Sequence, residues 1–503
     1  MTSANVVSTA EIKIVLFLMV DSSQDLRDTS FTLPVSYGFQ LLEFAENVFI
    51  FSCTPRYAGS IIFSMQNRFK RVWAIPISIL IIVGLYYVPP IHSRLAWRLE
   101  SLRTKVQYLV KPPEEAVFQP TQQAQLDLAV TKMLQTLQAT LTPPATSTPK
   151  PGPTLQPTVT TTPLPATVMM EGIKYEHQHG RLNYCGPANF SMALTYWGWD
   201  GDRDVIGRAV KPTDKDKNVM PYELQDYIID NVPGMSSAVR YGGDIEMLKR
   251  LISAGFPVLV EKGIYETDIN GKYSWMGHYA FVTGYDETSQ EIIYQDTYQP
   301  DAAKNPGPNR HIKYPAFLEG WRAFNYVFVV VFPNEKEGEV LTLLGPYADE
   351  LWASQHALGV AQTESQSLTD IDRFFAWFNV GTSHIALLQY IDAAVAYDYA
   401  FGIYADLNVN DSVRPYRMMW YQTGPYKAYY YSNRFADVIN LANTTLNDTI
   451  TEPVLEESLY WRGRAYYMAG KTDLAVKDYR EALKVHTKWI VAPQALQELG
   501  IQP

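Results

Sequence analysis

Apolar residues follow several different spacings along this chain, and each spacing predicts a different kind of element. Residues 72–91 are almost continuously apolar and carry no charge, which is close to the roughly 20 residues that a helix needs to cross a bilayer. In residues 190–197, apolar side chains recur at helical spacing. Residues 279–285 are rich in aromatic and β-branched side chains, so they predict a strand, with residues 291–296 as its return strand.

The apolar run 72–91 has the layout of a signal anchor. Basic residues within 68–71 precede it, aromatic residues lie near its ends, and no small-residue cleavage site follows. We therefore predict a signal anchor with a single transmembrane helix at 65–91. Met65 is then the expected start of the protein, and residues 1–64 are a doubtful N-terminal extension.

The chain between this anchor and the first globular domain has two parts. Residues 92–141 predict a juxtamembrane helical segment, because apolar side chains in its second half fall on one helical face. Residues 142–170 are dominated by Thr and Pro over most of their length and predict a disordered linker. We interpret this linker as an extended stalk, which places the catalytic domain outside the cytoplasmic membrane.

Length and composition narrow the possible functions. A chain of 503 residues predicts two or three domains. The net charge of −10 and the lack of a basic stripe or finger-type Cys/His spacing predict no nucleic-acid partner. No Gly-rich phosphate loop followed by Lys-Ser/Thr is present, which argues against a fused exporter ATPase. Two cysteines, Cys53 and Cys185, give no disulfide framework.

Cys185 is the candidate nucleophile. It stands at the predicted start of the helix that contains residues 190–197, and Pro187 suits the first turn of that helix. Unpaired amides and the helix dipole favour negative charge at this end. The thiol is therefore expected to ionise more readily than an ordinary cysteine.

His278 is the candidate base, and its partner follows from the register of the predicted hairpin. If Tyr285 pairs with Glu291 across the turn, His278 lies opposite Tyr298 and diagonal to Asp296 on the same face. The two side chains can then meet. A cysteine, a histidine and a third group that orients the imidazole are what a thiol hydrolase needs.

Three further residues complete the predicted site. Gln178 is the side-chain amide available just before the nucleophile, so it is the candidate oxyanion donor together with the Cys185 amide. Trp275 and Tyr279 flank the base and are expected to shield it or to shape a substrate groove.

Each of these residues has an ordinary structural alternative. Cys185 could be a small buried apolar residue, and Asp296 could cap a turn. His177, His179 and Cys185 could also form a zinc site. No second nearby cysteine and no helical His-Glu-x-x-His motif supports zinc, so we expect neither a metal nor an organic cofactor.

The segments Gln178 to Asn189, Gly277 to Asp286, and Asp296 together resemble a known family. They are similar to the papain-like cysteine peptidases related to the bacteriocin-leader (double-glycine) processing peptidases, in particular the stand-alone C39-like branch. The resemblance covers about residues 172–333 and implies an α+β papain-like domain at 171–335. It also implies Cys185 as nucleophile, His278 as general base, Asp296 as orienting acid and Gln178 as oxyanion donor.

The C-terminal part resembles a tetratricopeptide array. Gly463, Ala475, Tyr479 and Ala482 have the spacing of one repeat. Gly381, Ala393, Tyr397 and Ala400 have the same offsets, and residues 433–446 outline a degenerate middle copy. We predict an all-α helical-repeat domain at 345–503, with a generic helical bundle as the alternative. Repeat arrays of this kind offer a surface to a peptide or protein partner.

The sequence thus predicts a membrane-anchored, extracytoplasmic thiol peptidase that cleaves a peptide or protein substrate. Two other functions remain open at this point. The same residues could serve an amidase or acyltransferase that acts on cell-wall peptides, or the domain could be a catalytically silent peptide-binding module with the repeats as its working surface.

Overall fold

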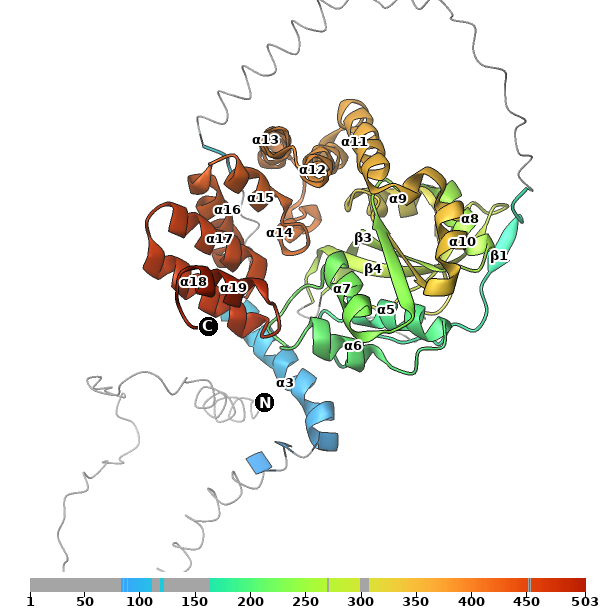
Figure 1. The fold of residues 1–503 in the computed structure, drawn as a ribbon, viewed down its shortest axis with the longest axis horizontal. Coiled ribbons are helices and arrows are strands. Elements are labelled where there is room, and N and C mark those ends of the chain that lie inside the picture. Colours follow the sequence, from blue (N-terminus) through green and yellow to red (C-terminus); the bar gives the residue numbers. More distant parts are fainter. Residues whose placement is uncertain are drawn as a thin grey trace, which may run out of the picture. The chain divides into compact units, whose positions relative to one another are not determined.

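The fold was analysed in a computed structural model of the chain. It describes residues 83–84, 86–87, 89–110, 118–121, 163–268, 271–298, 307–450, 452 and 454–503. Within these residues an α+β region is followed by an all-helical region (Figure 1).

One antiparallel sheet organises the α+β region. Its strands are β1 (Thr167–Met169), β2 (Met235–Arg240), β3 (Val258–Thr267), β4 (Tyr273–Asp286), β5 (Glu291–Gln295), β6 (Arg310–Lys313) and β7 (Phe328–Pro333). The strand order is β2-β7-β3-β4-β5-β6, and β1 pairs with the end of β4. The last residues of the predicted linker, Thr167–Met169, are therefore part of this sheet.

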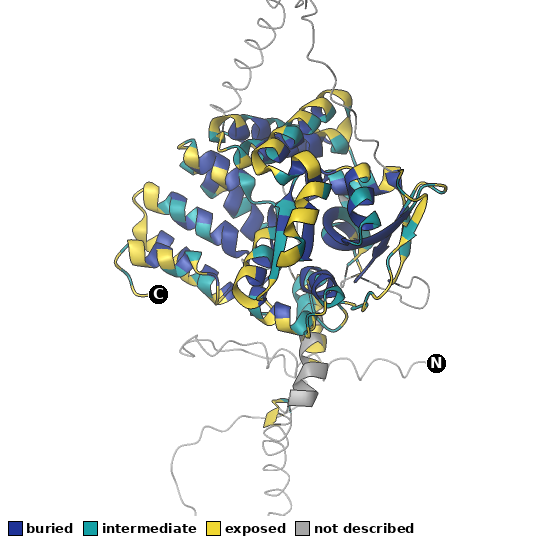
Figure 2. Ribbon diagram, turned by 45° about the vertical axis from the view of Figure 1, so that its right-hand side comes forward, coloured by how far each residue is buried: buried dark blue, intermediate teal, exposed yellow. Residues whose placement is uncertain are grey.

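Helices cover both faces of the sheet. They are α5 (Cys185–Tyr196), α6 (Arg203–Val210), α7 (Pro221–Asn231), α8 (Ile245–Ser253), α9 (Tyr314–Arg322) and α10 (Glu337–Leu344). Successive residues of β3 point to opposite faces: Leu259 packs with α5 to α7, while Val258 and Val260 pack with α8 to α10. Figure 2 shows the result, with buried strands between helices whose outer faces are exposed.

Helix α5 begins at Cys185, as the sequence predicts. Its N-cap, Tyr184, makes no side-chain capping hydrogen bond, so no side chain competes for the amides of the first turn. Residues 186–194 of this helix are all buried, rather than on one face only. The nucleophile candidate is thus fixed at the end of a rigid central helix.

The hairpin of β4 and β5 corrects the predicted register at the turn. Glu291 pairs with Asp286, not with Tyr285. A β-bulge between Val282 and Gly284 then shifts the ladder by one residue. Beyond the bulge the register is the predicted one, and the rings of His278 and Tyr298 lie 6.3 Å apart.

The C-terminal region is a series of helices. They are α11 (Glu350–Ser367), α12 (Asp370–Ala386), α13 (Tyr390–Asp406), α14 (Met418–Tyr421), α15 (Gly424–Tyr431), α16 (Phe435–Asn447), α17 (Glu456–Met468), α18 (Thr472–Val485) and α19 (Val491–Glu498). Short 3-10 turns occur at Asn334–Lys336, Gly345–Ala348 and Asp411–Val413.

Two glycines explain why the repeat spacing recurs. A Cβ atom on Gly381 would lie 2.6 Å from the Tyr397 ring, and one on Gly463 would lie 2.6 Å from the Tyr479 ring. In each helix pair, the ring of the second helix packs directly on the backbone of the first. Any larger residue at either glycine would force the two helices apart.

The helical region shares a hydrophobic core with the α+β region. Trp275 and Phe324 of the α+β region belong to the same buried cluster as Phe375 and Tyr429 of the helical region. Phe118, which precedes the linker, is buried in this cluster too, with its ring 5.1 Å from Phe401. The two regions therefore form one packed body.

Part of the predicted N-terminal organisation lies outside the described residues. This holds for residues 1–82, for the helical face at 122–141 and for most of the 142–170 linker. Helix α3 (Pro89–Val110) lies at the start of the predicted juxtamembrane segment. Among the described residues, no helix combines the length and the apolar character needed to cross a bilayer.

Candidate active site

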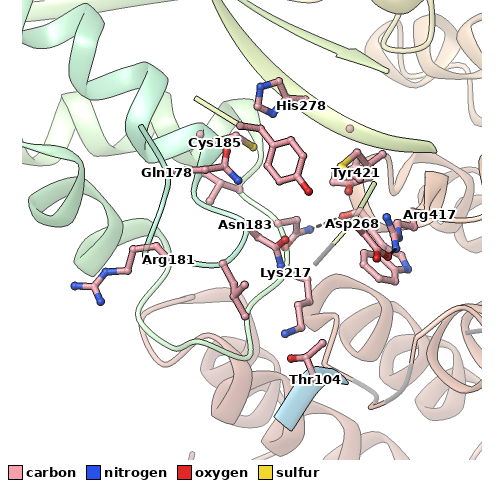
Figure 3. A pocket seen from close by; sticks show the side chains of 18 of the residues that line it. Thr104, Gln178, Arg181, Asn183, Cys185, Lys217, Asp268, His278, Arg417 and Tyr421 are labelled. Carbon is pink, nitrogen blue, oxygen red and sulfur yellow. Dashed lines mark hydrogen bonds and ion pairs between the residues drawn. The ribbon is translucent and has the colours of Figure 1, made fainter. Parts of the chain in front are cut away.

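Cys185 lies at the edge of a pocket of about 490 Å³. Loop 178–183, which leads into α5, forms one side, and the strands β3 and β4 form another (Figure 3). Residues between 215 and 219 of the α+β region also line the pocket. Further walls come from outside that region: from the C-terminal half of α3, and from Arg417, Trp420, Tyr421, Ile450, Glu452 and Val454 of the helical region. Cys185 is a free cysteine and is partly exposed.

His278 and Asp296 meet as the hairpin predicts. His278 Nε2 lies 2.9 Å from Asp296 Oδ1, and both side chains are buried. The Tyr298 amide also donates to Asp296 Oδ1 at 3.0 Å. Because Nε2 is engaged, Nδ1 is the imidazole nitrogen left to face Cys185, and His278 and Cys185 are close enough to shift each other's pKa. His278 thus interacts with both Asp296 and Cys185.

The pKa values of these three residues favour their charged forms. Burial would raise the pKa of Cys185, but the hydrogen bond and charge of His278, helped by the Tyr279 and Gly186 backbone, lower it below its ordinary value. Burial would lower the pKa of His278, yet the bonds and charges of Asp296 and Cys185 raise it to about 9. Both shifts move the pair toward its thiolate and imidazolium forms.

Two cations lie behind Asp296. Arg310 forms an ion pair with its second oxygen, Oδ2. Lys262, the cross-strand neighbour of His278, is buried nearby, and burial lowers its pKa to about 8 although Asp296 opposes this. Burial would raise the pKa of Asp296, but His278 and then Arg310 lower it. Asp296 is thus kept ionised in spite of its position.

Gln178 is held so that its amide group is available to the pocket. Its backbone N–H donates to the Thr297 carbonyl at 3.0 Å, and its side-chain carbonyl accepts from the Thr297 hydroxyl at 3.0 Å. Asn189, which is buried in α5, donates to the same hydroxyl oxygen at 3.3 Å and to the Cys185 carbonyl at 2.9 Å. Since the carbonyl end is engaged, the NH₂ end of Gln178 is left to face an oxyanion near Cys185.

The two predicted substrate-binding residues have different positions. Tyr279 lines the pocket, but it is buried, and its hydroxyl donates to the Val219 carbonyl at 3.0 Å. Trp275 does not line the pocket that holds Cys185. Its ring is buried and stacks on Phe324 at 6.0 Å and on Phe375 at 5.9 Å. The structure thus places Trp275 in the core that joins the two regions.

The histidines next to Gln178 have other partners. His177 Nδ1 lies 3.3 Å from the Arg203 guanidinium, and the rings of His177 and His179 pack edge to face. In the described part of the chain, no group of three or more His, Cys, Asp or Glu side chains is arranged to hold a metal ion. The zinc alternative therefore has no geometric support among these residues.

Several residues in or next to the site were not predicted from the sequence. Arg310 and Glu261 reach the site only through strand pairing, since Glu261 lies opposite Tyr279. Burial, and then the charge of Cys185, raise the pKa of Glu261 well above its ordinary value, so the neutral acid is favoured. Thr297 could have been predicted as a site residue, because it directly follows Asp296 in the sequence. Tyr421 lies too far along the chain for any local pattern to connect it with Cys185.

A thiol at a helix N-terminus, facing an imidazole that a carboxylate orients on an antiparallel sheet, is the arrangement found in papain-like cysteine peptidases. Residues 170–328 match the Peptidase_C39 like family, and residues 456–488 match the Tetratricopeptide repeat. The C39-like resemblance is thereby confirmed, and the tetratricopeptide resemblance is confirmed for the last repeat. A comparison with curated proteins found no match.

Proposed function

We propose that this protein is a thiol peptidase that hydrolyses peptide bonds with Cys185 as nucleophile. The observation that carries the proposal is that His278, hydrogen-bonded to Asp296, lines the same pocket as Cys185 and shifts its pKa. A structural cysteine needs neither an imidazole partner nor access to a pocket.

The first half of the proposed reaction forms an acyl-enzyme. The Cys185 thiolate attacks the carbonyl carbon of the scissile bond, and the negative charge moves to the carbonyl oxygen. The Gln178 amide and the Cys185 backbone N–H stabilise this oxyanion. The imidazolium of His278 then gives its Nδ1 proton to the leaving amine, and the C–N bond breaks.

The second half releases the enzyme. His278, now neutral, takes a proton from a water molecule, which attacks the thioester carbon. The C–S bond breaks, the acid product leaves, and thiolate and imidazolium are restored. Asp296 keeps the imidazole in one orientation throughout and stabilises its charged form.

We also propose that the protein is anchored in the cytoplasmic membrane with its catalytic domain outside. This rests on the uncharged run 72–91, the basic residues before it and the Thr/Pro-rich segment after it. Membrane fractionation tests this: the full-length protein is expected to stay in the membrane pellet after alkaline washing. External protease should then degrade the catalytic domain in intact cells, and full protection would contradict the orientation.

The peptidase activity is tested by incubating the purified full-length protein with a mixed peptide library and identifying new termini by mass spectrometry. Cleavage is expected from the wild type and from Cys53→Ser, which keeps Cys185 as the single cysteine. Cys185→Ala should lose cleavage by at least about three orders of magnitude. Equal cleavage by Cys185→Ala would contradict the proposal.

A further inference from the structure

Tyr421 comes from the helical region, yet its ring lies against β4 in the pocket that holds Cys185. A Cβ atom on Gly277, the residue before His278, would lie 3.0 Å from Cγ and Cδ2 of the Tyr421 ring. The missing side chain at Gly277 is therefore what lets the ring approach β4 so closely. Figure 3 shows Tyr421 on the wall of the pocket that holds Cys185.

The Tyr421 ring is held in place by aromatic and polar contacts. It packs edge to face on Trp275 and on Phe324, each with a centroid distance of 6.0 Å. Backbone hydrogen bonding by Gly277 is among the effects that lower the pKa of its hydroxyl. Burial raises the pKa of Tyr421, Arg417 opposes this, and the charge of Cys185 adds to it, so the phenol stays neutral beside the sulfur.

Helix α14, which ends at Tyr421, is fastened to the α+β region on both sides of the pocket. Asn218 donates to the Trp420 carbonyl at 2.8 Å, and Arg417 forms a nearly buried ion pair with Asp268 at 2.8 Å. Gln422, just after the helix, donates to the Ala323 carbonyl at 2.6 Å. The wall is thus fixed by bonds to three separate segments rather than by surface contact alone.

The pocket lining is mixed. Charged residues such as Lys217 and Glu452 line it, but so do apolar side chains: Val219 and Met276 from the α+β region, and Ile450 and Val454 from the helical region. The apolar part of such a lining selects a ligand side chain by size and hydrophobicity.

We propose that Tyr421 is a specificity-determining residue, and that its ring forms one wall of a subsite for an apolar side chain of the peptide substrate. This inference rests on the proposed peptidase function, because it assigns a side-chain preference to that same site. It makes the helical region part of the catalytic unit rather than only a platform for partners.

The test uses two peptidyl chloromethyl ketones that alkylate the Cys185 sulfur with loss of chloride. They differ only in the side chain next to the reactive group, which is leucine in one and tryptophan in the other. Inactivation rates are measured in the full-length Cys53→Ser background, with iodoacetamide as a small reference reagent. The variants are Tyr421→Ala and Tyr421→Trp, and Tyr431→Ala, an exposed tyrosine of the same region, is the control.

The wild type is expected to react faster with the leucine probe. Tyr421→Ala should raise the tryptophan to leucine rate ratio about tenfold or more, and Tyr421→Trp should lower it. The control should leave the ratio unchanged. Opposite shifts cannot arise from a general loss of folding. Iodoacetamide rates should stay within about twofold of the wild type, because the nucleophile itself is untouched.

Two results would overturn the inference, and they are distinguishable. An unchanged ratio in both Tyr421 variants, with normal iodoacetamide labelling, would show that Tyr421 does not select the side chain while leaving the peptidase proposal intact. If none of the reagents labels wild-type Cys185 near neutral pH, the peptidase proposal itself is contradicted. The proposed subsite is then contradicted as well.

Discussion

Two groups of buried ionisable side chains in this protein differ in how they are partnered. The first group is the proposed catalytic set of Cys185, His278 and Asp296. In it, Asp296 is surrounded by donors and cations, namely His278, Arg310 and the Tyr298 amide. The second group lies where the loop after α6 meets α17. It consists of four buried carboxyl groups, called here the acid cluster: Asp216, Glu223, Glu456 and Glu457.

The acid cluster has few charged partners. Asn218 donates to Glu457 at 3.2 Å and to Asp216 at 3.3 Å, and the Met220 N–H donates to Glu223 at 2.7 Å. The nearest contact of His486 with the cluster is 3.5 Å, to Glu223. Burial, the largest effect, and neighbouring acids raise the pKa of Glu456 well above its ordinary value. Burial similarly raises the pKa of Asp216 to about 7 although Lys211 opposes this. Burial alone therefore does not decide the charge of a carboxyl group: its partners do.

The two groups should oppose each other in the pH dependence of stability. The pKa of Asp296 is lowered, so its contribution is present above the unfolded-state pKa and is lost as pH falls through the folded-state value. The pKa values of the acid cluster are raised, so its protonated form stabilises the fold at low pH. That contribution is lost as pH rises toward about 7, the value for Asp216 and Glu457.

The largest effect is expected from Asp296→Asn. The variant keeps an acceptor for His278 but removes the charge, so the pKa of His278 should fall from about 9 and that of Cys185 should rise. We expect kcat/KM for peptide cleavage to fall by about two to four orders of magnitude. Asp230→Asn, an exposed carboxylate on α7, is the control. Unchanged kinetics in Asp296→Asn would show that the Asp296 charge has no role in the reaction.

Glu457→Gln should have the next largest effect, on stability rather than on activity. The unfolding free energy of the wild type is expected to fall between pH 5 and pH 8, and the variant should show a shallower fall. The difference should reach roughly 1–3 kcal/mol at pH 8 and vanish near pH 4. Denaturant titrations at each pH measure it, with the exposed Glu481→Gln as control. Parallel pH curves for wild type and variant would contradict the raised pKa.

Thr297→Val tests the hydrogen bonds that orient Gln178. The shape is preserved, but the donor to the Gln178 carbonyl is lost. We expect kcat to fall about tenfold with little change in KM, since an oxyanion is stabilised only in the transition state. The pH profile of Cys185 alkylation should not move. A shifted profile would mean that Thr297 acts on the thiolate instead.

The smallest effect is expected from Glu452→Gln. Glu452 pairs with Arg103 of α3 at 2.8 Å, and both side chains are partly exposed. Pairs of this kind contribute about 0–1 kcal/mol, and salt screens them. The unfolding free energy should change by less than about 1 kcal/mol at 0.15 M salt. A larger change would mean that this ion pair stabilises the fold as much as a buried ion pair does.

The sequence predicted the features that depend on short-range patterns. The start of α5 at Cys185 followed from the Gly-Pro turn and the apolar spacing after it. The contact between His278 and Asp296 was also predicted, although from a partly wrong register. The predicted pairing at the turn was wrong by one residue, and the bulge at Thr283 restores the predicted register before His278. Bulges leave little trace in side-chain patterns.

Features that depend on long-range packing were not predicted. Tyr421 is separated from Cys185 by most of two domains, and only the packed core brings it to the pocket. The acid cluster was missed because each of its carboxylates has the surroundings of an ordinary surface residue in the sequence. Trp275 was assigned to a groove because it is near His278, but alternation along β4 and packing against the helical region bury it.

The central claim is that His278 keeps Cys185 ionised in spite of burial. It is tested most directly by the rate of Cys185 alkylation with iodoacetamide from pH 5 to pH 10, for Cys53→Ser and Cys53→Ser/His278→Gln. The first protein should show a midpoint below that of an ordinary thiol, and the second a higher midpoint, because burial is then opposed only by the Tyr279 and Gly186 backbone. Coinciding profiles would contradict the account.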